Sequence, residues 1–262
     1  MNEKIALSVD REMTPERRNI KRLYMRLKIA PEEIGFECHH KKDCLSPRGG
    51  TRFFQTGDWP YVGSEYGKAK VLGKKTRILF ISMDRGGKHR TNPEFEKTQK
   101  DFRVNCIERG NSHMGVVSLV MEELVDNKSS ENYAKQFALI NSVKCRLISK
   151  SDQSTSTQTM RKRCLNNIKQ EIDELIPDLI IVQSLRPSEM IKTLFELNKP
   201  VYVGHDAAHP TKRILIYETK NRIIVTNFPH SRVKGLKYKK DEMPLFVAKS
   251  IEKIKELLQR SK

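Results

Sequence analysis

Short apolar runs alternate with longer amphipathic segments along most of the chain. Continuous apolar runs occupy residues 77–82, 137–143 and 178–183. Unbroken runs of this kind are typical of strands in a parallel sheet that is covered on both faces. Shorter strands are predicted at residues 201–203, 213–217 and 222–226. Helices are predicted at residues 14–29, 115–125, 158–175, 187–197 and 241–258.

The alternation of strands with helices predicts a three-layer α/β/α sandwich with a central, mostly parallel sheet. We expect a single domain over residues 1–262, with residues 1–35 as a basic, helical N-terminal extension. Residues 51–74 show no clear periodicity. Residues 88–112 are polar and are predicted to be irregular.

Functional sites in such sheets form at the carboxyl ends of the strands. Four segments follow predicted strands and should therefore share one rim of the sheet. They are residues 82–87, 141–145, 183–186 and 227–232.

The charge of the chain indicates an anionic partner. Its 262 residues include 50 Lys and Arg against 32 Asp and Glu, a net charge of +18. Nucleic acid is the simplest such partner, because each neutralised phosphate releases counterions. A membrane surface is the rival, but no apolar run approaches the ~20 residues of a spanning helix. Residues 1–11 are charged and lack the apolar core of a signal peptide. We expect a cytoplasmic, monomeric protein that binds DNA and no membrane.

Five cysteines are present, an odd number that argues against a framework of disulfides in a cytoplasmic protein. They are Cys38, Cys44, Cys106, Cys145 and Cys164. Small buried hydrophobic residues are one interpretation. The other is two pairs of thiolates that hold an iron–sulfur cluster or structural zinc. Lys144 and Arg146 flank Cys145 and would favour its thiolate form.

Polar side chains at the predicted rim have both chemical and structural interpretations. Asp84 could orient a water molecule or stabilise a cationic transition state, or it could simply form a turn. Asn141 could hydrogen-bond a base through its amide, or it could cap a strand. His230 could donate to a substrate carbonyl, or it could lie in a solvated turn. His205, Asp206 and His209 fit no standard metal motif and are interpreted as structural.

Several segments together resemble the uracil-DNA glycosylase superfamily, most closely its iron–sulfur family 4. The resemblance covers roughly residues 36–250, and the segments occur in the family's order. Residues 140–146, with Asn141 followed by Lys144-Cys145-Arg146, match the family most specifically. The other segments are Ser82-Met83-Asp84-Arg85-Gly86, residues 113–121, residues 177–181 and Pro229-His230-Ser231.

The resemblance implies a monofunctional DNA glycosylase that flips a base out of the helix. It implies that Asp84 and His230 are catalytic, that Asn141 recognises the base edge and that His113 packs on the base. Met83 and Arg85 would line the same pocket. The segment after His230 would bind DNA: Ser231, Arg232, Val233, Lys234 and Leu236, with Val233 or Leu236 as an apolar wedge.

The resemblance also implies a structural 4Fe-4S cluster, with structural zinc as the alternative. Its ligands would be Cys38, Cys44, Cys145 and Cys164, whereas Cys106 has no counterpart in the family.

The sequence departs from the family pattern at positions that would surround the substrate base. The first motif lacks its proline, His113 replaces a stacking aromatic residue, and Arg85 adds a charge. Residues 88–111 form an insertion that would line a larger pocket. We therefore expect uracil, a deaminated base or a modified pyrimidine as the target, in base-excision repair or in anti-phage defence. The alternatives are a non-catalytic nucleic-acid-binding protein on the same fold and a zinc-stabilised nuclease.

Overall fold

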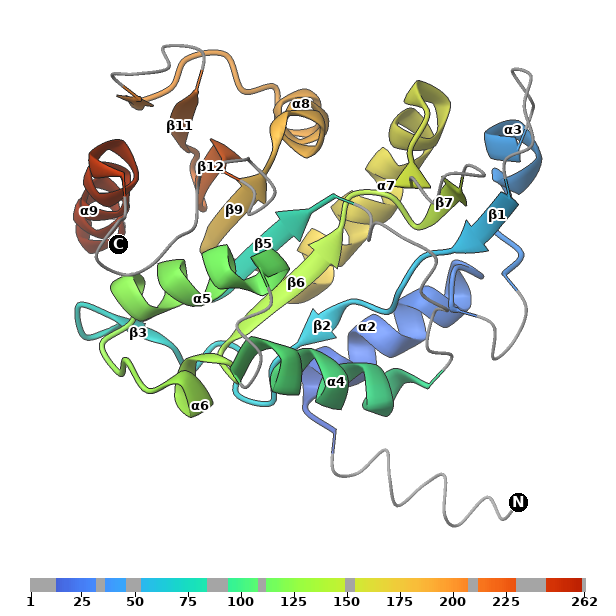
Figure 1. Ribbon diagram of the computed structural model, residues 1–262, viewed down its shortest axis with the longest axis horizontal. Helices are drawn as coiled ribbons and strands as arrows, with labels where there is room; N and C mark the ends of the chain where they lie inside the picture. Colours follow the sequence, from blue (N-terminus) through green and yellow to red (C-terminus); the bar gives the residue numbers. More distant parts are fainter. Residues whose placement is uncertain are drawn as a thin grey trace.

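A seven-stranded sheet forms the centre of the part of the chain that the structure describes (Figure 1). This computed structural model describes residues 13–31, 36–45, 53–83, 94–107, 112–148, 154–206, 212–229 and 244–260. The strand order is β10-β11-β12-β9-β5-β6-β2. The four inner strands that pair in parallel are β5 (Ile78–Ser82), β6 (Phe137–Asn141), β9 (Leu179–Gln183) and β12 (Ile223–Phe228). The antiparallel strands are β2 (Tyr61–Val62), β10 (Tyr202–His205) and β11 (Arg213–Glu218).

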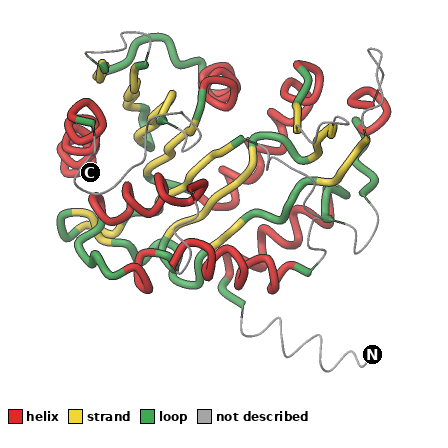
Figure 2. Tube along the Cα trace, viewed as in Figure 1, coloured by secondary structure: helices red, strands yellow, loops and turns green. Residues whose placement is uncertain are grey.

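Helices cover both faces of this sheet, which confirms the predicted layering of helix, sheet and helix (Figures 1 and 2). One face packs against α2 (Pro15–Arg26), α7 (Gln158–Leu175) and α8 (Leu185–Leu194). The opposite face packs against α5 (Ser112–Leu124) and α9 (Leu245–Arg260). Every helix in the described part of the chain is too short or too polar to span a lipid bilayer.

Successive side chains of a strand point to opposite faces of the sheet, so the buried side chains are divided between the two faces. In β5, Leu79 and Ile81 pack on the side of α2 and α7, whereas Ile78 and Phe80 pack on the side of α5 and α9. All four side chains are fully buried. This two-sided burial explains why the inner strands have continuous apolar sequences. Burial of each large apolar side chain stabilises the folded state by roughly 1.5–3 kcal/mol.

Several short elements were not predicted from the sequence. Strands β1 (Phe53–Thr56), β7 (Cys145–Ile148) and β8 (Ser154–Thr155) form a small separate sheet, and β3 (Lys70–Val71) pairs with β4 (Lys74–Lys75). The short helices are α3 (Lys41–Leu45) and α6 (Ser130–Tyr133). The expectation of irregular structure over residues 88–112 was wrong for helix α4 (Phe95–Ile107). This helix is polar because it packs at the margin of the fold, against β2, α5 and α6.

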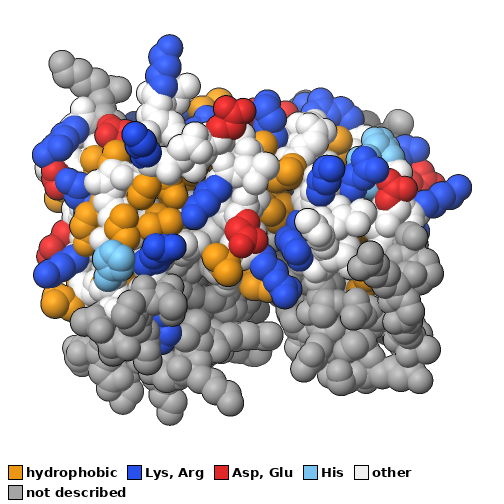
Figure 3. Space-filling view, turned by 90° about the horizontal axis from the view of Figure 1, so that it is seen from above, with side chains coloured by type: hydrophobic (Ala, Val, Ile, Leu, Met, Phe, Trp, Pro, Cys, Tyr) orange, Lys and Arg blue, Asp and Glu red, His pale blue; other side chains and the backbone are white. Residues whose placement is uncertain are grey.

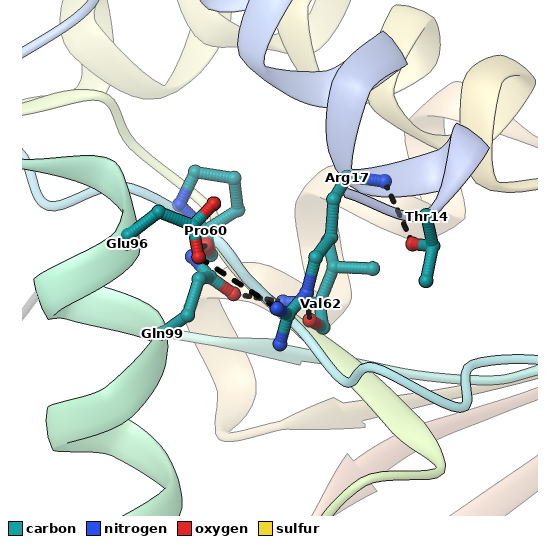
Figure 4. Close-up of polar contacts among 6 residues, drawn as sticks. All are labelled: Thr14, Arg17, Pro60, Val62, Glu96 and Gln99. Carbon is teal, nitrogen blue, oxygen red and sulfur yellow. Dashed lines mark hydrogen bonds and ion pairs between the residues drawn. The ribbon is translucent and has the colours of Figure 1, made fainter. Parts of the chain in front are cut away.

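Helix α2 is docked into the domain through its own contacts, although it belongs to the predicted extension. Figure 4 shows Arg17 Nε donating to the Val62 carbonyl at 2.7 Å, with Glu96 3.8 Å from the same guanidinium. Gln99 of α4 accepts from Val62 N–H and donates to the Pro60 carbonyl, each at 2.8 Å. These contacts join α2, β2 and α4 at one edge of the sheet.

Candidate functional site at the carboxyl edge of the sheet

Four parallel strands end side by side, as the sequence predicted. Ser82 of β5 pairs with Asn141 of β6, and Phe228 of β12 pairs with Gln183 of β9. Ile81 pairs with Val182, so that β5 and β9 also end at the same level. The described parts of the four predicted rim segments therefore lie along one edge.

Asn141 is the last residue of β6, and its position is fixed from two sides. The N–H of the next residue, Ser142, donates to the Ser82 carbonyl at 2.9 Å. The Lys144 ammonium donates to the backbone carbonyl of Asn141 at 2.5 Å. Asn141 itself is half-buried, so its backbone is held at the rim while part of the residue stays accessible.

Lys144 belongs to a buried charged network that the sequence did not reveal. Its ammonium lies 2.6 Å from Glu171 Oε2, and the two side chains are 2% and 0% exposed. The Tyr24 hydroxyl donates to the other carboxylate oxygen at 2.5 Å, and the Lys144 ammonium lies 5.8 Å from the centre of the Tyr24 ring. Burial raises the pKa of the Glu171 carboxyl, while Lys144 and Tyr24 favour its charged form. The network connects α2 and α7 to the segment that carries Asn141.

The four predicted ligand cysteines come from different elements. Cys38 precedes α3, Cys44 lies in α3, Cys145 begins β7 and Cys164 lies in α7. None of them forms a disulfide in the described part of the chain; Cys38 is half-buried and the other three are buried. Cys44, Cys145 and Cys164 pack in one hydrophobic core and Cys38 packs against it, and the other three thiols each raise the pKa of Cys145. The four residues therefore lie in one region beside the Lys144 network.

Hydrogen bonding and burial set the protonation of these thiols. Cys145 Sγ–H donates to Cys44 Sγ, which lowers the pKa of Cys44 and raises that of Cys145. Burial raises the pKa of Cys164 to about 11, against a lowering contribution from the Lys144 N–H and ammonium. Lys144 thus favours a thiolate at Cys164, whereas the sequence had suggested this effect for its neighbour Cys145.

The donors match a thiolate-bound cluster in type and in number. Within the described ranges, no three His, Cys, Asp or Glu residues are arranged to hold a single metal ion. Four cysteine thiolates are the donor set of a 4Fe-4S cluster and equally that of a structural zinc site.

Several predicted site residues cannot be placed relative to these groups. Met83 directly follows β5 and is half-buried, whereas His113 lies in α5 but its side chain is not among those described. The same is true of Cys106 in α4. Eight further residues lie outside the described residues: Asp84, Arg85, His230, Ser231, Arg232, Val233, Lys234 and Leu236.

The predicted structural role of His205 and Asp206 is compatible with their positions. His205 ends β10 and is exposed, and Asp206 N–H donates to the Lys212 carbonyl at 3.1 Å. His209 lies outside the described residues.

Two residues at the rim have backbone angles that are unusual for side-chain-bearing residues. Ser184, directly after β9, has φ 73° and ψ 163°, and Asn227 in β12 has φ 58°. Such conformations cost about 1–3 kcal/mol and cluster at functional sites. The buried Ser188 hydroxyl holds both: it donates to the Ser184 carbonyl and accepts from Asn227 N–H, each at 2.6 Å. No glycine marks either position in the sequence, so this feature could not be predicted.

Lys and Arg side chains are spread across the full width of the face seen in Figure 3, between neutral and hydrophobic side chains. Such a distribution agrees with the net charge of +18. No protein-family model matches the chain. No curated protein sequence matches it either.

Proposed function

We propose that the protein is a DNA glycosylase with the fold of the uracil-DNA glycosylase superfamily. The observation that carries the proposal is Asn141, which has a side-chain amide and lies at the carboxyl end of an inner parallel strand, where its backbone carbonyl accepts a hydrogen bond from the buried Lys144. An amide offers a donor and an acceptor to the edge of a base. The Lys144–Glu171 pair fixes the backbone from which this side chain projects, and a fixed backbone limits the positions that the amide can take.

In the proposed reaction, the C1′–N bond of a flipped nucleotide breaks and its electron pair leaves with the base. A water molecule supplies the oxygen that bonds to C1′ and loses a proton, and the base takes up a proton. Asp84 stabilises the developing charge on the sugar and orients the water. His230 donates to the leaving base, and His113, Met83 and Arg85 surround it. These five roles rest on the sequence resemblance.

DNA binding rests in this proposal on phosphate contacts. Ser231, Arg232 and Lys234 contact the backbone, while Val233 or Leu236 enters the stack in place of the flipped base. The basic surface gives binding a steep dependence on salt concentration.

A 4Fe-4S cluster bound by Cys38, Cys44, Cys145 and Cys164 has a structural role in this proposal. Bound by these residues, it would join Cys145, and with it the Asn141 segment, to α3 and α7. Purified protein is expected to be brown and to contain about four iron atoms per chain. Cys164→Ser should lose the iron, whereas Cys106→Ser should retain it. A colourless protein that contains zinc would show that the four cysteines bind structural zinc and not an iron–sulfur cluster.

The test of activity is the release of free base. Single- and double-stranded DNA carrying uracil, hypoxanthine, xanthine or a modified cytosine is incubated with the protein, and free bases are identified by mass spectrometry. Asp84→Asn should reduce release by several orders of magnitude while DNA binding survives; Asp173→Asn, at an exposed position of α7, is the matched control. Full activity of Asp84→Asn would overturn the assigned role. Salt-dependent DNA binding without release of any base would favour the non-catalytic alternative.

A further inference from the structure

The connections around β5 and β9 change direction, which creates a topological switch point between these two strands. The chain leaves β5 through α4 and α5 towards β6 on one side, whereas it leaves β9 through α8 towards β11 and β12 on the other side. Helices α5 and α8 lie on opposite faces of the sheet (Figure 1). In open α/β sheets, ligands bind outside the carboxyl ends of the strands at such a point.

The two strands that flank this point both end in a buried polar side chain. Ser82 ends β5 and Gln183 ends β9, and each is 1% exposed. Among the described residues, neither Ser82 Oγ nor Gln183 Nε2 has a hydrogen-bond partner. A buried polar group without a partner is destabilising, so two of them on neighbouring strands indicate groups that are reserved for a ligand.

Strand alternation places these side chains on the same face as Asn141. Phe80, two residues before Ser82, and Ile181, two residues before Gln183, both pack on the side of α5 and α9. Leu139, two residues before Asn141, does the same. Asn141, Ser82 and Gln183 therefore form a row on one face, across three adjacent strands. The row spans two inter-strand steps, or roughly 10 Å, which exceeds the width of a single pyrimidine ring.

We infer that Gln183, together with Ser82, recognises the far end of the base whose near edge is bound by Asn141. The substrate is then a base that is larger than uracil and carries a hydrogen-bond acceptor oxygen on the side away from Asn141. Gln183 Nε2–H donates to that oxygen, and the Ser82 hydroxyl bonds the part of the base between the two amides. Deaminated purines and pyrimidines with an oxygen-bearing substituent share this chemistry. The inference rests on the proposed glycosylase function.

The backbone beyond Gln183 keeps this amide in place. Ser184 N–H donates to the Phe228 carbonyl at 2.9 Å, and the Ser184 carbonyl accepts from the Ser188 hydroxyl. The two peptide groups that flank Ser184, a residue with positive φ at the junction of strand and helix, are thereby both hydrogen-bonded. The backbone directly after Gln183 is therefore fixed.

The test compares Gln183→Leu and Ser82→Ala with wild-type protein on duplexes carrying uracil, hypoxanthine or 5-hydroxymethyluracil. The matched control is Gln136→Leu. Gln136 is also buried, and its amide oxygen has no hydrogen-bond partner in the part of the chain that the structure describes, but it directly precedes β6, at the opposite end of the strand from Asn141. Wild-type protein should excise at least one of the two larger bases faster than uracil. Gln183→Leu should lower the ratio of larger-base to uracil excision about tenfold or more, as expected for one lost hydrogen bond in a buried site. The two larger bases distinguish a purine from a substituted pyrimidine.

A measurement of stability distinguishes a recognition role of Gln183 from a structural role. Gln183→Leu removes Nε2, which has no hydrogen-bond partner among the described residues, together with Oε1, so the variant should unfold at about the same denaturant concentration as the control Gln136→Leu, whereas only Gln183→Leu should change the excision ratio. An unchanged excision ratio in Gln183→Leu, or excision of uracil alone by wild-type protein, would overturn the inference and leave the glycosylase function standing. Release of no base from any duplex would overturn the proposed function, and the inference with it.

Discussion

The side chains buried on the two faces of the central sheet differ in polarity. The face covered by α2, α7 and α8 contains the Lys144–Glu171 pair, and Cys44, Cys145 and Cys164 pack in the same core. On the other face, the buried side chains described in α5 and α9 are apolar except for Ser250. The first face supports the segment that ends in Asn141, and the second face presents the row of Asn141, Ser82 and Gln183. In the proposed site, the residues that support Asn141 and the residues that would recognise the base therefore lie on opposite faces of one sheet.

The largest effect should come from breaking the buried ion pair on the supporting face. Glu171→Leu leaves the Lys144 ammonium buried without its counter-charge, and should lower the free energy of unfolding by about 3–5 kcal/mol. Denaturant unfolding measures this loss. In the double variant Lys144→Met/Glu171→Leu most of the loss should be recovered, because no charge remains buried. Equal and additive losses from the two substitutions would show that the two groups do not interact.

A smaller effect is expected from the tyrosine that joins this network. Tyr24→Phe removes a hydrogen bond to a charged acceptor and should cost about 1.5–3 kcal/mol. Tyr66→Phe is the matched control, because its buried hydroxyl donates to the neutral Leu175 carbonyl at 3.2 Å and should cost only about 0.5–1.5 kcal/mol. Calorimetry or denaturant unfolding can rank the two. If both cost the same, the charge of Glu171 has no part in the contact.

Apolar packing should not distinguish the two faces. Ile180 and Ile181 are neighbours in β9 that point to opposite faces, and both are fully buried. Each change to Val deletes one methylene and should cost about 0.5–1.5 kcal/mol. The comparison is made by unfolding the two variants under identical conditions. A much larger cost for one of them would mean that the faces differ in packing as well as in charge.

The smallest effect belongs to an exposed ion pair that lies outside both cores. Lys28 Nζ lies 2.9 Å from Glu37 Oε2 and lowers the pKa of Glu37. A lowered pKa stabilises the folded state above the ordinary pKa of a glutamate, and this contribution is lost as the pH falls through the lowered value. Both groups are exposed, so solvent screens the pair, and Lys28→Met should leave unfolding at neutral pH unchanged. In an NMR titration of Lys28→Met, the pKa of Glu37 should rise.

The inner strands could be predicted because a strand that is buried on both faces has a continuous apolar sequence. Residues 78–82, 137–141 and 179–183 are continuous apolar runs that end in a polar residue. Once these strands are assumed to be parallel, their ends must share an edge, and Ser82, Asn141 and Gln183 fall together. The predicted rim therefore follows from local pattern and topology alone.

The supporting network could not be predicted because its members look like ordinary surface residues in the sequence. Glu171 lies in a helix with many charged residues, and Lys144 lies in a polar stretch between two strands. The partner of Glu171, Tyr24, is 147 positions away in sequence. Only the packing of α2 against α7 shows that these side chains are buried together. Strand β7 was missed for a similar reason, because its partner β1 is a four-residue strand in a region without periodicity.

The long separation between Tyr24 and Glu171 has a consequence for the order of assembly. Helix α2 and the Cys38–Cys44 segment are made early, but Cys145, Cys164 and Glu171, which complete the four-cysteine region and the charged network, follow more than a hundred residues later. Contacts between distant parts of a chain form late and slowly, since the intervening loop must close first. When only the first half of the chain has left the ribosome, α2 can already contact β2 and α4, but Tyr24, Cys38 and Cys44 still lack these later partners. The charged network and the four-cysteine region take shape only after α7 has left the ribosome.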